Sequence, residues 1–273
     1  MQELYCYQMK MPSPYFFSVD FEVWEKSFYD DIDGEGRKLF QELNIKEAYE
    51  GDKIVGFIQY GKTAFGFDEN GEISEEVSYP IIRAFYFEKD RKDVGNALLE
   101  FAMRELNTDE RIYAFFHYFG MSCFARHGKL FESFPWVEEV LKAHGFVVEH
   151  ENVYYSSVIN EMQENEIQLD WHEVSKGGQQ VCDFLRKGKQ IGGCEIHYVT
   201  SDIAYLRWIY LNDDLQNQGL GSKCMDSLKH ALKKKGCGRL DTDTALNNHR
   251  AQHYYEKKQF IREGITRSYY TKG

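Results

Sequence analysis

The sequence predicts an α/β fold in which one unit of strands and helices occurs twice. The chain has 273 residues, and a single domain typically has roughly 100 to 200, so two domains are expected. Apolar residues make up 42% of the chain and aromatic residues 16%, which is enough for substantial hydrophobic cores and argues against a disordered or fibrous protein. Strand-like and helix-like segments also alternate along the chain, as they do in layered α/β folds.

The first half, residues 1–160, begins with an aromatic-rich stretch. After it, segments with the apolar pattern of strands alternate with segments with the apolar pattern of helices. Gly51-Asp52 separates two strand-like runs and indicates a hairpin. Val94, Leu98 and Leu99 lie at the spacing of one helix face. The expected elements are a helix at 34–43, strands at 45–49, 54–60 and 79–87, a helix at 94–106, a strand at 112–116, a helix at 134–144 and a strand at 153–159.

The second half, residues 161–273, repeats this order in shorter form. Its expected elements are strands at 179–185, 190–199 and 203–211, a helix that begins near Leu220 and ends at Gly236, a strand at 239–245, a helix at 248–258 and a strand at 266–270. The first half carries an insertion at about 118–133 that the second half lacks. We therefore infer an internal duplication of one unit.

Charge is unevenly divided between the two halves. The whole chain has 33 basic and 44 acidic residues, a net charge of −11, which disfavours a nucleic-acid partner because phosphate contacts need a basic excess. The first half has 16 basic and 29 acidic residues, a net of −13, and the second half has 17 and 15, a net of +2. The acidic surface either serves solubility alone or attracts a cationic ligand, with an anionic ligand held by the second half.

Six cysteines are scattered along the chain, and no two of them form a Cys-x-x-Cys pair. We therefore expect reduced, mostly buried thiols, with neither a disulfide framework nor a metal site. The first ten residues lack an apolar core, and no later stretch approaches about 18 uncharged apolar residues. A cytoplasmic location without membrane contact is the expectation, and the sequence is compatible with an oligomer.

A glycine-containing loop, Gln216-Asn217-Gln218-Gly219-Leu220-Gly221, lies between a predicted strand and a predicted helix. Backbone N–H groups at such a junction converge on a phosphate, and the positive end of the helix adds attraction. Ser222 and Lys223 would add side-chain donors in the first turn. The third glycine of a dinucleotide-binding turn and the Gly-Lys-Ser/Thr of a P-loop are both missing. The glycines could also serve only to make a tight turn.

The residues downstream of this loop extend the pattern. They are Asn248-His249-Arg250-Ala251, followed by Tyr254-Tyr255-Glu256-Lys257-Lys258-Gln259-Phe260. Together with the loop, which fits Gln/Arg-x-x-Gly-x-Gly/Ala, this assembly resembles the GNAT superfamily of acyl-CoA-dependent N-acyltransferases over residues 203–260. The resemblance implies two tandem GNAT-like domains, each with a mixed, mostly antiparallel central sheet flanked by helices. Gln259 departs from the glycine that the family usually has at that position.

The resemblance also implies acetyl-CoA as cosubstrate, no metal, and transfer of an acetyl group to a primary amine of a small molecule or peptide. Tyr255 stands at the position of the family's general acid, and a phenol can protonate a departing thiolate because their pKa values are close. Tyr255 could also be an ordinary packed aromatic residue, and the chain could be a non-catalytic acyl-CoA-binding regulatory or scaffold protein. The implied cofactor-binding residues are Leu211, Gln216, Asn217, Gln218, Gly219, Leu220, Gly221, Ser222, Asn248 and Ala251.

The general base is left open, because Tyr205 stands where the family often has a glutamate or histidine. Glu195 and His197 alternate on the neighbouring strand and could relay the proton through water, or could simply face solvent. Asp241 and Asp243 share a strand face and allow the same two interpretations.

The first half aligns with the same pattern but lacks its two chemical features. With Val94-Gly95 set against Leu220-Gly221, Asp93 replaces the first glycine of the loop, and its carboxylate would repel a phosphate. Leu141 occupies the position of Tyr255 and cannot donate a proton.

We therefore expect a degenerate GNAT-like domain at 1–160 and an acyl-CoA-binding catalytic domain at 161–273. Only about 18 residues, 161–178, precede the first predicted strand of the second half, so the first half is expected to help cover the acceptor pocket. The first half could also be retained for packing alone. Its acidic character favours a cationic acceptor such as a polyamine, an aminoglycoside or a peptide N-terminus.

Overall fold

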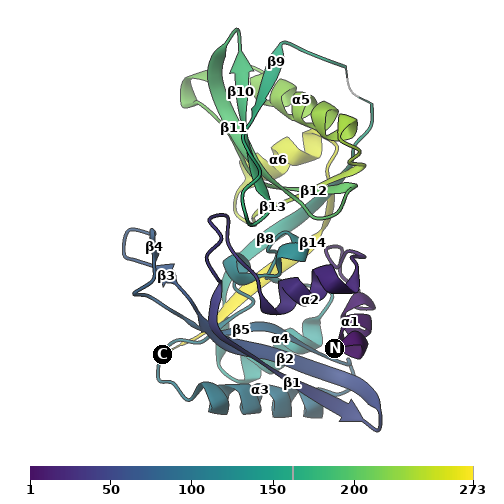
Figure 1. Ribbon diagram of the computed structural model, residues 1–273, viewed down its shortest axis with the longest axis vertical. Helices are drawn as coiled ribbons and strands as arrows, with labels where there is room; N and C mark the ends of the chain where they lie inside the picture. Colours follow the sequence, from purple (N-terminus) through teal and green to yellow (C-terminus); the bar gives the residue numbers. More distant parts are fainter. Residues whose placement is uncertain (162, 273) are drawn as a thin grey trace. The chain divides into compact units, whose positions relative to one another are not determined.

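The computed structural model describes residues 1–161 and 163–272, and the chain packs as two compact units. Unit 1 contains Met1–Asp33, Arg37–Glu151 and Ile265–Gly273, and unit 2 contains Gly34–Gly36 and Asn152–Gly264. Figure 1 shows the course of the chain through both units. In each unit a mixed, mostly antiparallel set of strands is flanked by helices, which confirms the predicted fold class.

Unit 1 places helices on both faces of a sheet with the strand order β1-β2-β5-β6-β14. Strands β5 and β6 are parallel, whereas β1 with β2, β2 with β5 and β6 with β14 are antiparallel. In Figure 1, α3 lies on one side of this sheet and α1 and α2 lie on the other. The elements are α1 (Gln2–Met9), α2 (Phe21–Tyr29), β1 (Phe40–Glu50), β2 (Lys53–Thr63), β3 (Gly66–Phe67), β4 (Ile73–Ser74), β5 (Pro80–Phe87), α3 (Lys92–Leu106), β6 (Tyr113–Ala114), β7 (Leu130–Phe131) and α4 (Pro135–Ala143).

Local sequence explains most of these elements. Gly51 has φ +59 and makes the tight turn of the β1–β2 hairpin, where a side chain would be strained. Every residue of β5 is buried, as expected for a strand with both faces covered. Helix α3 buries Val94, Leu98 and Leu99 on one face, which confirms the predicted helical period.

Unit 2 has the strand order β8-β13-β12-β11-β10-β9, in which β12 and β13 are parallel. Helices α5 and α6 cover one face of this sheet, and their apolar side chains share a core with those of the strands. Leu228 and Leu232 of α5 are fully buried there, together with Leu206 and Leu240 of the strands. The elements are β8 (Phe146–Val158), β9 (Ile167–Trp171), β10 (Gln179–Arg186), β11 (Lys189–Tyr198), β12 (Ile203–Leu211), α5 (Leu220–Lys234), β13 (Arg239–Ala245) and α6 (His249–Lys257). The last strand, β14 (Ile261–Thr271), begins in unit 2 and belongs to unit 1 from Ile265 onward.

Each half of the sequence ends in a strand that pairs with strands of the opposite half. The closing strand of the first half pairs in unit 2, and the closing strand of the second half pairs in unit 1. Strand β8 follows α4, and its residues 152–158 pair antiparallel with β13 in unit 2. Strand β14 follows α6, and it pairs antiparallel with β6 and β7 in unit 1, for example Tyr269 with Ala114. The two packed units therefore do not coincide with the two sequence repeats, because the repeats exchange their closing strands, β8 and β14.

Several elements predicted from the sequence periodicity were wrong or were missed. Instead of a helix at 34–43, Ile32 and Lys38 form an antiparallel bridge and β1 begins at Phe40, because Gly36 takes φ +85 and ends any helical run. The expected strand at 112–116 is reduced to the two residues of β6. Helices α1 and α2 and strand β9 were not predicted, so 161–178 contains a strand that the sequence pattern did not reveal.

All six cysteines are free, and five of them are buried, which confirms the expected burial of most of the thiols. Among the described residues, no helix is long and apolar enough to cross a membrane. No group of three or more His, Cys, Asp or Glu side chains that could hold a metal ion is found in this same part of the chain.

Candidate functional site

The two parallel strands of unit 2 separate halfway along their length. Their register runs from Ile203–Arg239 to Leu206–Thr242, although β12 continues to Leu211 and β13 to Ala245. The register between β11 and β12 shifts at the same level, so Arg207 is the extra residue of a bulge. A bulge bends its strand and interrupts regular pairing. Beyond Leu206 and Thr242, the facing backbone edges of the two strands are therefore not paired with each other in the described register.

The glycine-containing loop lies between the end of β12 and helix α5. Asn217 and Gly219 both have positive φ, +61 and +78, and Gly219 is the N-cap of α5. Within the described chain, α5 has neither a side-chain cap at this end nor an acidic residue in its first turn. The N–H groups of the first helical turn have no acceptor inside the helix, so they remain available to an anion.

Neighbouring side chains hold this loop in place. The Gln216 amide donates to the Leu211 carbonyl oxygen at 3.1 Å, and its oxygen accepts from Arg250 Nη2 at 2.7 Å. The Tyr254 hydroxyl donates to the Gly221 carbonyl oxygen at 2.8 Å. Helix α6 therefore fixes the loop from the side, which stabilises the conformation that presents the N–H groups.

The ten predicted cofactor-binding residues lie at the end of β12, in this loop, and at the starts of α5 and α6. Leu220 is buried in the core, so it can contribute its backbone but not its side chain. The Asn248 side chain accepts from the Ala251 N–H at 3.1 Å and caps α6, which gives it a structural role besides any contact with a ligand. The side chain of Lys223, suggested as a donor, pairs with Glu166 at 2.6 Å.

Tyr255 lies on α6 with its ring packed in the core, where 6% of the residue is exposed. Its ring centroid is 5.8 Å from that of Tyr155 and 5.3 Å from that of Phe260. Burial raises the pKa of Tyr255, the charge of Asp243 raises it further, and a hydrogen bond with Thr242 acts in the opposite direction. Thr242 is the last residue of β13 that pairs with β12, so the Tyr255 hydroxyl lies where these two strands begin to separate.

A cluster of polar side chains from three strands lies beside this separation, on the sheet face opposite to α6. The Tyr205 hydroxyl of β12 donates to Asp243 Oδ1 at 2.6 Å, and the Asn152 amide of β8 donates to Asp243 Oδ2 at 2.6 Å. Burial, and then the charge of Asp243, raise the pKa of the Tyr205 hydroxyl well above its usual value. Asp243 itself is only half-buried.

A second carboxyl group, that of Asp241, lies two residues before Asp243 on the same face of β13. Asp241 is fully buried, and it accepts from Tyr154 Oη and from Arg239 Nε, both at 2.7 Å. Burial raises the pKa of Asp241 to about 6, against the hydrogen bond from Arg239. The sequence pattern allowed Asp241 to be a surface residue, and that interpretation was wrong.

The two other predicted catalytic side chains lie on β11. Glu195 pairs with Arg207 Nε at 2.8 Å through one carboxylate oxygen, and the other accepts from Trp208 Nε1 at 3.0 Å. His197 is buried, 5% exposed, opposite Tyr205 in the β11–β12 register. Both oxygens of Glu195 are thus engaged, as are both oxygens of Asp243. Sequence reasoning did not identify the cluster of Tyr205, Asp243 and Asn152. The available signal was the occurrence of Tyr205 at the expected position of the base.

Unit 1 differs at both equivalent positions. Asp93 lies in the first turn of α3, and its pKa is lowered by Arg91 and by the backbone N–H groups of Val94 and of Asp93 itself. A carboxylate of the chain therefore takes the place that a bound anion would have at this helix end. Leu141 is fully buried on α4. The degenerate character of the first copy stays a prediction.

Comparisons with known proteins agree with this geometry. Residues 145–260 match the model of the acetyltransferase (GNAT) family. No curated protein matches the chain in sequence.

Several solved structures share the fold at low sequence identity. A tandem GNAT protein from the clavulanic acid biosynthesis pathway has a TM-score of 0.58 at 10% identity, covering 92% of this chain and 94% of that one. A GNAT-family acetyltransferase from Colwellia psychrerythraea has a TM-score of 0.51 at 11% identity, covering 91% and 93% of the two chains. A glucosamine N-acetyltransferase region of a fungal multi-domain β-N-acetylglucosaminidase has a TM-score of 0.61 at 11% identity, covering 92% of this chain and 34% of that one. The chain therefore carries an acetyltransferase domain of the GNAT family at residues 145–260, within a fold similar to that of tandem GNAT proteins.

Proposed function

We propose that unit 2 catalyses transfer of an acetyl group from acetyl-CoA to a primary amine of a small molecule or peptide. The observation that carries this proposal is the separation of β12 and β13, which places Tyr255 on one face of the sheet and the Asp243–Tyr205 pair on the other. The Tyr255 hydroxyl can donate a proton, and the Asp243 carboxylate can accept one. An acyl transfer between a thioester and an amine needs both.

The loop and helix α5 fit the cofactor. Gly219 and Asn217 direct the chain into α5 with the first-turn N–H groups exposed, and Gly219 has no neighbouring atom within 4 Å of the position of an added Cβ, among the described residues. These N–H groups would hold the pyrophosphate of acetyl-CoA. When bound, acetyl-CoA supplies a thioester carbonyl that an amine can attack.

The residues of the chain would move two protons. Asp243 takes a proton from the attacking amine nitrogen as the new C–N bond forms. Tyr255 gives its phenolic proton to the sulfur as the C–S bond breaks, and both residues are restored by exchange with water. A tyrosine hydroxyl is protonated at neutral pH even at its usual pKa, and burial raises the pKa of Tyr255 further, so Tyr255 is in the state that a general acid needs before the reaction. Tyr205 holds the Asp243 carboxylate in position through its hydroxyl.

Tyr255→Phe tests the role of the acid. The substitution keeps the ring contacts with Tyr155 and Phe260 and removes only the hydroxyl, so acetyl-CoA binding measured by calorimetry is expected to stay unchanged. Loss of a general acid lowers kcat by about 10²- to 10⁴-fold. Tyr155→Phe is the matched control, because it removes a hydroxyl that bonds to Glu256 at 3.1 Å in the same aromatic cluster.

Thiol release with a panel of amines is the readout. Equal turnover by the wild type and Tyr255→Phe would show that Tyr255 is not the acid. Tight acetyl-CoA binding without transfer to any amine would instead favour the alternative function, a non-catalytic acyl-CoA-binding regulatory or scaffold protein.

A second comparison separates the two candidate bases. Asp243→Asn keeps an acceptor for the Tyr205 hydroxyl but removes the charge, and it is expected to lower kcat/KM by about 10²- to 10⁴-fold, as loss of a general base does. Glu195→Gln removes the same charge from a carboxylate whose two oxygens are held by Arg207 and Trp208. A larger loss of activity in Glu195→Gln would assign the base to Glu195, as one of the two sequence-based interpretations had it.

A further inference from the structure

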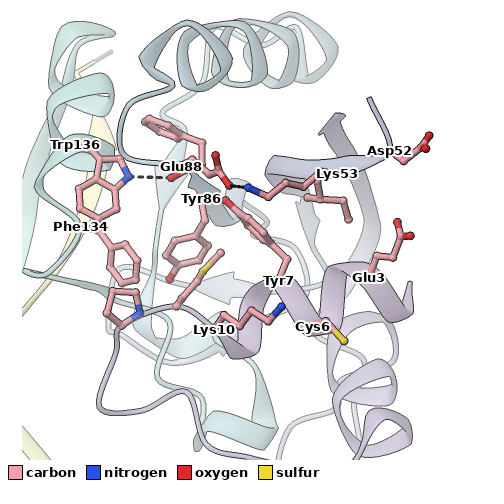
Figure 2. Close-up of a pocket in the computed structure, with 14 residues that line it drawn as sticks. Glu3, Cys6, Tyr7, Lys10, Asp52, Lys53, Tyr86, Glu88, Phe134 and Trp136 are labelled. Atoms are coloured by element: carbon pink, nitrogen blue, oxygen red, sulfur yellow. Dashed lines mark hydrogen bonds and ion pairs between the residues drawn. The ribbon is translucent and has the colours of Figure 1, made fainter. Parts of the chain in front are cut away.

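Unit 1 contains a cavity of about 570 Å³ that the proposed acyl transfer does not use. Helix α1 forms one side of it, the ends of β2 and β5 form the floor, and the start of α4 closes the other side. This volume lies within the roughly 300 to 1,000 Å³ of small-molecule sites. Figure 2 shows the aromatic rings of Tyr86, Phe134 and Trp136 around the cavity, with Tyr7 across from them.

The interior of this cavity is apolar because the polar atoms of its aromatic walls bond to other parts of the protein. Trp136 Nε1 donates to the Phe87 carbonyl oxygen at 2.9 Å, and the Tyr7 hydroxyl donates to the Val55 carbonyl oxygen at 3.3 Å. The Tyr86 hydroxyl has a hydrogen bond with Tyr15. The rings therefore offer mainly apolar and π surface to a ligand, which suits a ring or a short alkyl chain.

Charged side chains gather at the rim, and carboxylates outnumber ammonium groups. The rim has the carboxylates of Glu3, Asp52 and Glu88 and the ammonium groups of Lys10 and Lys53. Lys53 pairs with Glu88 at 2.5 Å, as the dashed line in Figure 2 shows. The carboxylates of Glu3 and Asp52 and the ammonium group of Lys10 remain at the rim. Burial, and then the charge of Glu88, raise the pKa of the Tyr7 hydroxyl, so this wall residue stays uncharged.

We propose that this cavity binds a small organic amine, with a ring or alkyl body against the aromatic walls and a protonated amino group at the rim near Glu3 and Asp52. A cation on an apolar body meets both features, since aromatic faces and carboxylates each attract it. A carboxylic acid of the same shape would be repelled by the rim. Because unit 1 has Asp93 and Leu141 at the positions of the loop glycine and of Tyr255, this is binding without acetyl transfer.

Cys6 provides a direct readout, because it lines the cavity and is the one exposed cysteine among the six. The probe is phenethylamine, and the matched comparison is 3-phenylpropionate, which carries a negative charge on the same body. Binding is measured by calorimetry on the full chain without acetyl-CoA, and the rate of Cys6 alkylation by iodoacetamide is measured by mass spectrometry. We expect phenethylamine to bind and to slow alkylation of Cys6 in proportion to occupancy, whereas 3-phenylpropionate does neither.

Three single substitutions localise the binding. Glu3→Gln and Asp52→Asn are each expected to weaken phenethylamine binding by about two- to fivefold, the range for a partly exposed charge pair. Glu22→Gln, on an exposed carboxylate of α2 outside the cavity, is expected to leave it unchanged. The proposal is overturned by any of three results: no binding, binding that neither protects Cys6 nor responds to the rim variants, or equal binding of 3-phenylpropionate. Since acetyl-CoA is not in the assay, these results are independent of the proposed transferase activity.

Discussion

The buried carboxyl group of Asp241 is expected to make the stability of the protein depend on pH, and Asp241→Asn is expected to remove that dependence. Asp241 is 0% exposed, and burial raises its pKa from 3.8 to about 6 in spite of the hydrogen bond from Arg239. Between these two pH values the folded state binds more protons than the unfolded state. The free energy of unfolding therefore falls as the pH rises through this range.

The size of the effect follows from the two pKa values. Relative to the fully protonated state, ionisation of Asp241 lowers the free energy of unfolding by about 1.6 kcal/mol at pH 5 and by about 2.9 kcal/mol at pH 7. The wild type thus loses about 1.3 kcal/mol between pH 5 and pH 7 through this group. An asparagine at this position has no proton to release, so the variant does not lose it.

Urea unfolding followed by intrinsic fluorescence from pH 4.5 to 7.5 measures this difference. The stability of Asp241→Asn minus that of the wild type is expected to rise by about 1.3 kcal/mol between pH 5 and pH 7. Asp170→Asn is the matched control, because it removes an exposed carboxylate from β9 of the same unit. Parallel pH curves for Asp241→Asn and the wild type would refute the reasoning.

Three further outcomes are expected. Gly219→Ala forces a side chain into a left-handed backbone conformation at a cost of about 1 kcal/mol, and it should raise the Kd for acetyl-CoA measured by calorimetry. Gly51→Ala imposes the same strain in the β1–β2 turn and should leave that Kd unchanged. Asp31→Ala leaves the guanidinium of Arg83 buried without its carboxylate at 2.5 Å, and thermal unfolding should show a loss of about 3 to 5 kcal/mol. If the acidic first half attracts a cationic acceptor, the KM for that acceptor should rise with salt, and a KM that stays constant would contradict steering.

The sequence predicted the fold class and the position of the loop and of Tyr255 because these depend on short-range patterns. A strand of period two, a helix of period 3.6 and a glycine at positive φ can each be recognised within about a dozen residues. The hairpin at Gly51-Asp52 and strand β13 were placed well for this reason. The helix expected at 34–43 failed because a glycine-rich turn outweighed its apolar pattern.

Only the tertiary structure decided which side chains meet. Asn152, Tyr205 and Asp243 come from three strands that are distant in sequence, and their contacts depend on β8 pairing with β13 and on β12 separating from it. The same holds for the cavity of unit 1, whose walls come from α1, β2, β5 and α4. The sequence determined the local elements and their chemical groups, whereas long-range strand pairing determined the site, because no local pattern specifies which distant strands become neighbours.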